Sequence, residues 1–195
     1  MHTTDTSGGS LREHLIDTGV TLVDTEGTAA LSLREIARRA GVSHGAPRRH
    51  FPTHLQLLSA IARRGFTDLG EQTTRALADA GQGPRAQVAA LARTYLGFAA
   101  RHRGMYELMF RHDLLESGEL GLRETSLRLF AVLTDRVAAA RPDAEPALVA
   151  GALWANLHGL AQLWGWGSLQ LAAAVEGIEP LLASVLDAHL GPEPR

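Results

Sequence analysis

The 195-residue sequence contains no cysteine, and all nineteen of its basic residues are arginine. The absence of cysteine excludes disulfides, thiolate nucleophiles and cysteine-ligated zinc. The absence of lysine excludes Schiff-base chemistry on a lysine and a phosphate-binding loop of the P-loop type. These two absences remove several large classes of enzyme and leave a chain of ordinary apolar (45%) and charged (21%) content.

Long apolar runs and alternating strand patterns are also missing. No uninterrupted apolar run approaches the length of about 20 residues that spans a bilayer. The N-terminal residues lack the basic-then-apolar order of a signal peptide. We therefore expect a cytoplasmic protein with no membrane partner, and an all-α fold, because apolar residues recur at helical spacing almost throughout.

The stretch from residue 31 to residue 66 is the most informative part of the chain. Ser32 is followed three residues later by Glu35, which predicts a capping box at a helix start. Apolar residues then recur at helical spacing up to Gly41, where glycine allows a left-handed turn. Ser43 is expected to cap the next helix. The spacing predicts a helix-turn-helix over about residues 32–51.

Pro47 perturbs the start of that second helix. A proline removes a helical hydrogen bond and crowds the carbonyl four residues before it. We therefore expect either an irregular, 3₁₀-like first turn or a helix that begins nearer Ala46.

Charge is distributed unevenly along the chain, although the net charge is only −2. Residues 1–66 hold eight arginines against six acids, whereas the rest hold eleven arginines against fifteen acids. Between Ser32 and Phe66 the only acid is Glu35. The positive charge thus gathers on the helix-turn-helix, as expected of a nucleic-acid footprint.

This stretch resembles the DNA-binding region of TetR-type transcriptional repressors. The pattern IAxxAGVSxGAxxxHFPxxxxLL falls on residues 36–58 without a gap. The resemblance implies a helix-turn-helix domain over residues 10–66 and a helical effector-binding and dimerisation domain over residues 67–195, joined by a connecting helix. Residues 1–9, small and polar, are expected to be a disordered tail.

The resemblance and the residue types together predict ten DNA-contacting residues. Arg48 stands where the family usually has a tyrosine that touches the DNA backbone, and it is expected to replace that contact. His54 stands where a lysine is common, and its phosphate contact is expected to be weaker and pH-dependent. The predicted contacts are Ser32, Arg34, Ser43, His44, Gly45, Ala46, Arg48, Arg49, His50 and His54.

The second part of the chain is expected to be helical after a glycine- and proline-containing break at residues 81–84. Helices are predicted over residues 85–100, 104–112, 120–140, 147–163 and 175–190, with a loop at 113–119. The helix at 147–163 is apolar around its whole circumference, so we expect it to lie between its own domain core and a partner chain.

An effector site is predicted in this second domain. Trp154, His158 and Gly159 resemble the Trp-His-Gly type of C-terminal ligand-binding domain found on some TetR-type regulators. A mostly apolar cavity with a few polar groups would suit a small molecule. The same residues could equally be plain core, and His158 a hydrogen-bonded core histidine. The candidates are Tyr95, Phe98, Met105, Tyr106, Met109, Phe110, Trp154 and His158.

The resemblance implies a homodimer that pairs its last two long helices in a four-helix bundle. It also implies a repressor that leaves a near-palindromic double-stranded operator when a small apolar effector binds. An activator and an effector-independent regulator remain open, as does a helical enzyme or carrier with a structural helix-turn-helix. No cofactor or metal is expected, because His44, His50 and His54 have no carboxylate or cysteine beside them, and no catalytic cluster is readable.

Overall fold

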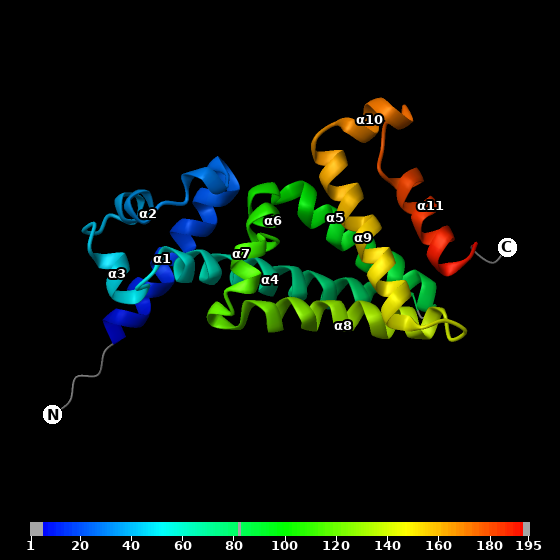
Figure 1. The fold of residues 1–195 in the computed structure, drawn as a ribbon, viewed down its shortest axis with the longest axis horizontal. Coiled ribbons are helices and arrows are strands. Elements are labelled where there is room, and N and C mark those ends of the chain that lie inside the picture. Colours follow the sequence, from blue (N-terminus) through cyan, green and yellow to red (C-terminus); the bar gives the residue numbers. More distant parts are fainter. Residues whose placement is uncertain (1–5, 82, 193–195) are drawn as a thin grey trace. The chain divides into compact units, whose positions relative to one another are not determined.

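A computed structural model describes residues 6–81 and 83–192. Within these residues the chain forms helices and no strand (Figure 1), so the predicted all-α class is confirmed. The chain divides into two compact units. Unit 1 comprises the residues up to Asp68 together with His102–Thr125, and unit 2 comprises Leu69–Arg101 together with the chain from Ser126 onward.

Two helices, α4 and α8, contribute to both units. Unit 1 contains α1 (Thr6–Glu26), η1 (Thr28–Ala30), α2 (Leu33–Arg39), α3 (Ala46–His50), the first part of α4 (His54–Asp79), α6 (Arg103–Met109), α7 (His112–Glu116), η2 (Glu119–Gly121) and the start of α8 (Leu122–Ala140). Unit 2 contains the remainder of α4 and α8 with α5 (Pro84–Arg101), α9 (Pro146–Gly165), α10 (Ser168–Ala173) and α11 (Glu179–Leu190).

The core of unit 1 forms where α1 meets α2 and α4. Leu15 and Leu22, two turns apart on α1, are both buried, as is Ile36 of α2. Gly19 lies between the two leucines, and a Cβ atom there would lie only 2.3 Å from the Cδ1 atom of Ile61 in α4. The missing side chain thus allows α4 to approach α1 closely.

Helix α1 begins earlier than the sequence predicted. The predicted tail spans residues 1–9, of which residues 1–5 lie outside the described residues and the others belong to α1, which starts at Thr6. The helix therefore extends over the last four residues of the predicted tail. Helix α1 ends at Glu26, and Gly27 after it adopts a φ of 80°.

The predicted domain boundary also differs from the observed division. Residues 102–125, which the sequence assigned to the second domain, belong to unit 1, where α6 packs against α1. A Cβ atom at Gly104 would lie 2.1 Å from the carbonyl oxygen of Val23. This long-range contact has no local sequence signal. The predicted loop at 113–119 contains α7 and part of η2.

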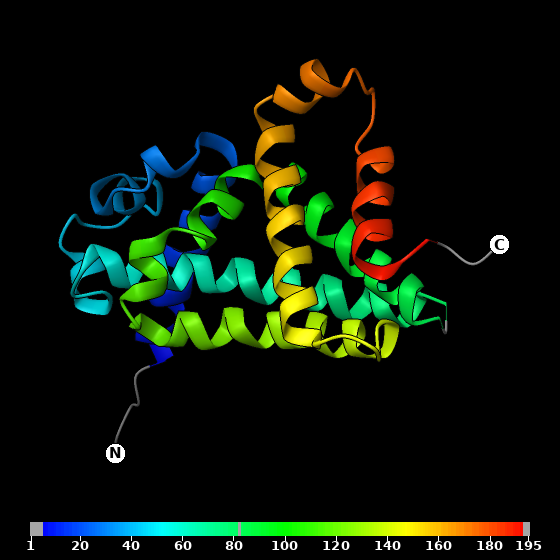
Figure 2. The same cartoon turned by 45° about the vertical axis from the view of Figure 1, so that its right-hand side comes forward.

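The core of unit 2 is built mainly by α5, α9 and α11. In both views α9 and α11 run side by side in opposite directions, and α10 lies in the connection between them (Figures 1 and 2). The α9 residues Leu153 and Leu157 and the α11 residues Leu182 and Leu186 are buried in one apolar cluster. These spacings of four residues give each helix one inward stripe.

The end of the chain holds two departures from the predicted helices. Helix α10 was not predicted. The last helix begins at Glu179 rather than at residue 175, and Ala174, the C-cap of α10, has a left-handed φ of 50°. A left-handed residue ends a helix and redirects the chain. The apolar pattern predicted one helix from residue 175, but the backbone turns here and the helix begins only at Glu179.

Candidate nucleic-acid interface

Helix α2 begins and ends with the local signals that its sequence contains. The Ser32 hydroxyl oxygen accepts a hydrogen bond from the Glu35 backbone N–H at 3.1 Å. At the other end Gly41 has a φ of 68°. The N–H of Val42 donates to the Ala37 carbonyl and that of Gly41 donates to the Arg38 carbonyl. This pair of bonds is a Schellman motif, which confirms the predicted glycine turn.

The predicted capping box is only half formed. The Ser32 N–H donates to the Ala30 carbonyl at 2.8 Å and not to the Glu35 side chain. The turn before α2 therefore satisfies this N–H, and the Glu35 carboxylate is left to bind elsewhere.

Helix α3 starts at Ala46, with Gly45 as its N-cap and no side-chain cap. The prediction of a start near Ala46 is confirmed, and the prediction that Ser43 caps this helix is wrong. Pro47 decides this outcome, because in the first turn of a helix its missing N–H has no intrahelical partner to lose. Pro47 is buried, whereas Arg48 and Arg49 are exposed.

The predicted DNA contacts separate into an outward group and a group that packs. Ser32, Arg34, Ser43, His44, Gly45, Arg48 and Arg49 are exposed, and Ala46 and His50 are half-buried. In the part of the chain that the structure describes, no ion pair involves Arg34, Arg48 or Arg49. These three guanidinium groups are open to an external anion.

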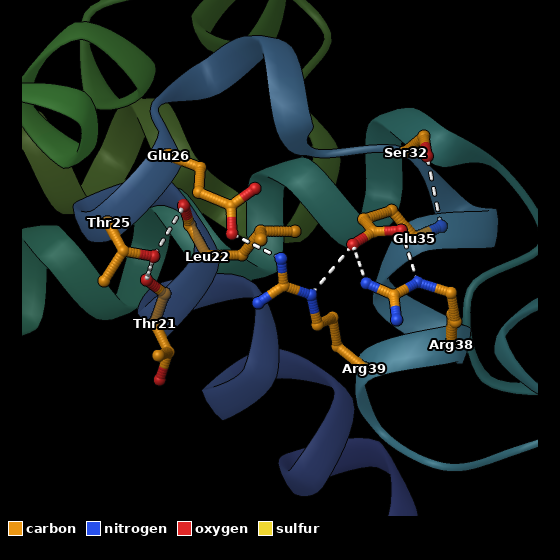
Figure 3. Close-up of polar contacts among 8 residues, drawn as sticks. All are labelled: Thr21, Leu22, Thr25, Glu26, Ser32, Glu35, Arg38 and Arg39. Atoms are coloured by element: carbon orange, nitrogen blue, oxygen red, sulfur yellow. Dashed lines mark hydrogen bonds and ion pairs between the residues drawn. The ribbon is translucent and has the colours of Figure 1, made fainter.

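Arg38 and Arg39 are engaged within the protein, as Figure 3 shows. Arg38 donates from Nε and Nη2 to the two Glu35 carboxylate oxygens at 2.8 and 2.6 Å. Arg39 donates from Nε to Glu35 at 2.8 Å and from Nη2 to Glu26 of α1. The bonds from Arg38 and then from Arg39 lower the pKa of the Glu35 carboxyl from 4.5 to about 2. Two acids therefore balance two arginines.

Three further side chains contact the helix-turn-helix or its flanks from positions distant in the sequence. The His54 ring donates from Nε2 to the Leu31 carbonyl, since a carbonyl oxygen can only accept. The Arg12 guanidinium lies 5.1 Å from the centroid of the Phe51 ring, and His14 bonds to the Ala40 carbonyl at 3.2 Å. The His54 ring, predicted to face phosphate, thus links the start of α4 to the segment before α2. Sequence reasoning missed Arg12 and His14, which have no local signal.

Residues 15–61 match the family described as bacterial regulatory proteins, tetR family, and residues 88–188, more than half of the chain, match the tetracyclin repressor-like C-terminal domain. The chain belongs to the TetR family. This result confirms the resemblance read from the motif, and it favours a transcriptional regulator over an enzyme or carrier with a structural helix-turn-helix.

Individual relatives of this TetR-family chain agree with that assignment. The HTH-type transcriptional regulator BetI of Stenotrophomonas maltophilia (strain R551-3) is 36% identical over 80 residues, 41% of each chain, so the match spans less than half of that relative. A protein of unknown function from Rhodococcus sp. RHA1 has a similar structure, with TM-score 0.81, 29% identity, and coverage of 96% of this chain and 97% of that one. The multidrug binding protein EbrR, complexed with imidazole, gives TM-score 0.59, 26% identity, and coverage of 94% and 96%.

Four of the predicted effector residues of this TetR-family protein lie in unit 1. Met105, Tyr106 and Met109 are each no more than 3% exposed. The Phe110 ring centroid lies 5.6 Å from that of Phe66, in a T-shaped pair, and 5.1 Å from that of Tyr106, in a tilted pair. A Cβ atom at Gly65 would lie 2.6–2.7 Å from the two methionines. Within unit 1 these side chains pack as core.

The other four effector candidates lie in unit 2. The Tyr95 hydroxyl and the His158 Nδ1 atom are 2.9 Å apart and share a hydrogen bond. The Trp154 ring lies 5.9 Å from the His158 ring and 6.1 Å from Phe130, and Phe98 is fully buried. Burial lowers the pKa of His158 below 6.5, so its ring is neutral at pH 7. Unit 2 therefore holds a neutral polar pair next to aromatic rings.

Two negative observations apply to residues 6–81 and 83–192 only. No three histidine or acidic side chains there are grouped so that they could hold a metal ion. No helix there is both long enough and apolar enough to cross a bilayer.

Proposed function

We propose that this protein is a sequence-specific repressor that acts in the cytoplasm on a near-palindromic operator. The observation that carries the proposal is the division of α3 into a buried residue, Pro47, and two exposed arginines without ion pairs, Arg48 and Arg49. Arginine binds guanine through O6 and N7 or binds phosphate. His44 and the small residues Gly45 and Ala46 at the start of α3 let its backbone approach a groove.

A homodimer through α9 and α11 supplies the second reading head. The outward residues of α9 include Leu148 (72% exposed) and Leu163 (38%), and its C-cap Trp166 (63%) lies on the same face at helical spacing. On α11 the outward residues Ala183, Ser184 and Ala188 are small, so a partner helix can approach closely. An apolar face on a soluble monomer marks an interaction site. Two such copies would bind half-sites about 34–36 Å apart or multiples of that distance.

The effector is expected to be small and largely apolar. Tyr95 and His158 supply a hydrogen-bonding pair beside the Trp154 ring, which suits the mostly apolar lining with few polar groups of a ligand site. Trp154, His158 and Gly159 also favour the Trp-His-Gly type of domain. The related EbrR is named a multidrug binding protein. An effector releases DNA only if it binds the DNA-free state more tightly, by typically about 1–3 kcal/mol.

Two alternative regulators remain as outcomes of an experiment. An activator would bind the same operator but raise transcription, because the sign depends on where the operator lies relative to the promoter. An effector-independent regulator would bind DNA with an affinity that no small apolar compound changes. Transcription from the operator-bearing promoter, measured with and without a compound library, separates these from a ligand-released repressor.

The proposal is tested by titrating labelled DNA from immediately upstream of the gene at several salt concentrations. We expect submicromolar, salt-dependent binding, since specific complexes reach Kd values of about 10⁻⁸–10⁻¹¹ M. Arg49→Ala and His44→Ala should each weaken operator binding by about 1–3 kcal/mol, the value of a good base contact. The control Arg75→Ala removes an exposed arginine of α4 outside the motif. Unchanged operator affinity in both motif variants would refute this assignment of α3.

A further inference from the structure

The inference concerns Arg38, and it rests on the proposed DNA binding. Arg34 and Arg38 lie one helical turn apart on α2, so they share one face. In a helix-turn-helix the first helix crosses the DNA backbone. Arg34 is exposed and without an ion pair among the described residues, whereas Arg38 on the same face is held by Glu35.

The geometry of the Arg38–Glu35 pair neutralises this arginine on the side of α2 that carries Arg34. Both carboxylate oxygens of Glu35 accept from Arg38, in the bidentate arrangement that is the strongest for this pair (Figure 3). The Arg38 side chain is nevertheless 59% exposed, so DNA could reach it. What keeps Arg38 from a phosphate is its ion pair with the Glu35 carboxylate.

Arg39 differs from Arg38 in its partners. Arg39 also bonds to Glu26 of α1, so it keeps one carboxylate when Glu35 is removed. Within residues 6–81 and 83–192, Arg38 forms an ion pair with Glu35 alone. Loss of the Glu35 charge would therefore leave Arg38 without a paired carboxylate, whereas Arg39 would keep Glu26.

We propose that Glu35 is a specificity-determining residue, which withholds Arg38 from DNA phosphates and so limits sequence-independent binding. A phosphate that displaced Glu35 from Arg38 would have the freed carboxylate beside it, so the pair adds little to phosphate attraction in either arrangement. Sequence-independent binding comes almost entirely from neutralised phosphates. An additional unmasked arginine acts in every register on DNA, whereas base contacts hold the operator complex in one register. Unmasking therefore raises the affinity for unrelated DNA more than the affinity for the operator.

The decisive experiment measures binding of the full-length protein to an unrelated duplex at several salt concentrations. Glu35→Gln should raise this affinity on the order of tenfold at low salt and steepen the slope of log K against log salt by about 0.9 per DNA-binding domain. Glutamine suits the third position of a helix as well as glutamate does, so the fold is retained, which the helical circular-dichroism spectrum and a cooperative thermal transition verify. The double variant Glu35→Gln/Arg38→Gln, which has the wild-type net charge, should return the slope to the wild-type value.

A matched control removes the same charge elsewhere in unit 1. Glu107→Gln removes the carboxylate that pairs with Arg103 on α6 at 3.0 Å, and it should leave the slope unchanged. An equal effect of both single variants would mean that net charge alone acts, and it would overturn the proposal. An unchanged or flatter slope for Glu35→Gln would also overturn it.

The proposed function is tested separately by the wild-type protein on the upstream DNA. If the wild type does not prefer that DNA over the unrelated duplex, the operator assignment fails. The slope comparison on unrelated DNA still decides the role of Glu35, because it needs no operator.

Discussion

Replacing Gly104 by alanine tests the close packing of α6 against α1. A Cβ atom at this position would lie 2.1 Å from the Val23 carbonyl oxygen, 3.1 Å from its carbon and 3.2 Å from the Gly27 Cα atom. All three neighbours are backbone atoms, so no side-chain rotation relieves the clash. The same Val23 oxygen accepts the Gly27 N–H at 3.0 Å. The Val23 carbonyl therefore cannot turn away from the new Cβ atom without losing this hydrogen bond. The substitution must therefore move one helix relative to the other.

The magnitude follows from two opposing effects. Overpacking of a well-packed contact costs about 1–3 kcal/mol, and more where the backbone must shift. Alanine recovers at most about 1 kcal/mol of helix propensity over glycine. At about 2–4 °C per kcal/mol for a chain of this size, a net loss of about 2 kcal/mol lowers the Tm by roughly 4–8 °C.

The assay is thermal unfolding by circular dichroism at one fixed protein concentration, because the Tm of an oligomer depends on concentration. Gly70→Ala is the matched control, since it lies within α4 and its Cβ atom would lie 3.5 Å from Leu129, an ordinary contact. The control should raise the Tm or leave it unchanged. A Gly104→Ala variant that melts at or above the wild-type temperature would refute the packing argument.

Three further predictions use other parts of the molecule. The folded-state pKa of Glu35 is lowered to about 2, so the stability that its carboxylate contributes is present above pH 4.5 and is lost as the pH falls toward 2. The Tm difference between wild type and Glu35→Gln should therefore shrink as the pH falls from about 6 to about 3, and a constant difference would contradict this. Trp166→Ser should weaken the dimer by about 3 kcal/mol, two copies at 1.5 each, in sedimentation at several dilutions, whereas Leu171→Ser on α10 should not; an unchanged dimer in Trp166→Ser would exclude this face from the interface. Tyr106→Ala should lower the free energy of unfolding by about 3–5 kcal/mol, and the Tm with it, because Tyr106 is 2% exposed; an unchanged Tm with weaker effector binding would instead assign Tyr106 to a ligand site.

The sequence predicted best those features whose signal and partner lie within a few residues. The Ser32 cap and the Gly41 turn are decided by residues three to five apart, and both were predicted. The start of α3 followed from Pro47, whose lack of an N–H is a property of that residue alone. The predicted class, all-α with a helix-turn-helix, was confirmed because it depends on such local patterns.

Features that depend on distant residues could not be predicted. Glu35 was expected to bond back to the Ser32 N–H, but η1 satisfies that N–H, and the carboxylate binds two arginines instead. His54 was expected to face phosphate, yet it bonds to a carbonyl 23 residues away. The grouping of α6 with the first unit likewise depends on the absence of a side chain at Gly104. The spacing of apolar residues along the chain carries no information about such long-range contacts.

The five-residue length of α3 has a consequence for how this protein can change over evolution. A helix this short is not stable alone, so its shape is maintained by the buried Pro47 and Phe51. Arg48 and Arg49, which face outward, take no part in that packing. With Arg48 and Arg49 as the proposed DNA contacts, substitutions at these two positions would alter which DNA sequence is preferred while the fold is preserved. Selection for folding and selection for a new regulatory target act on different residues of one helical turn, so duplicated copies of the gene can diverge in target without passing through unfolded intermediates.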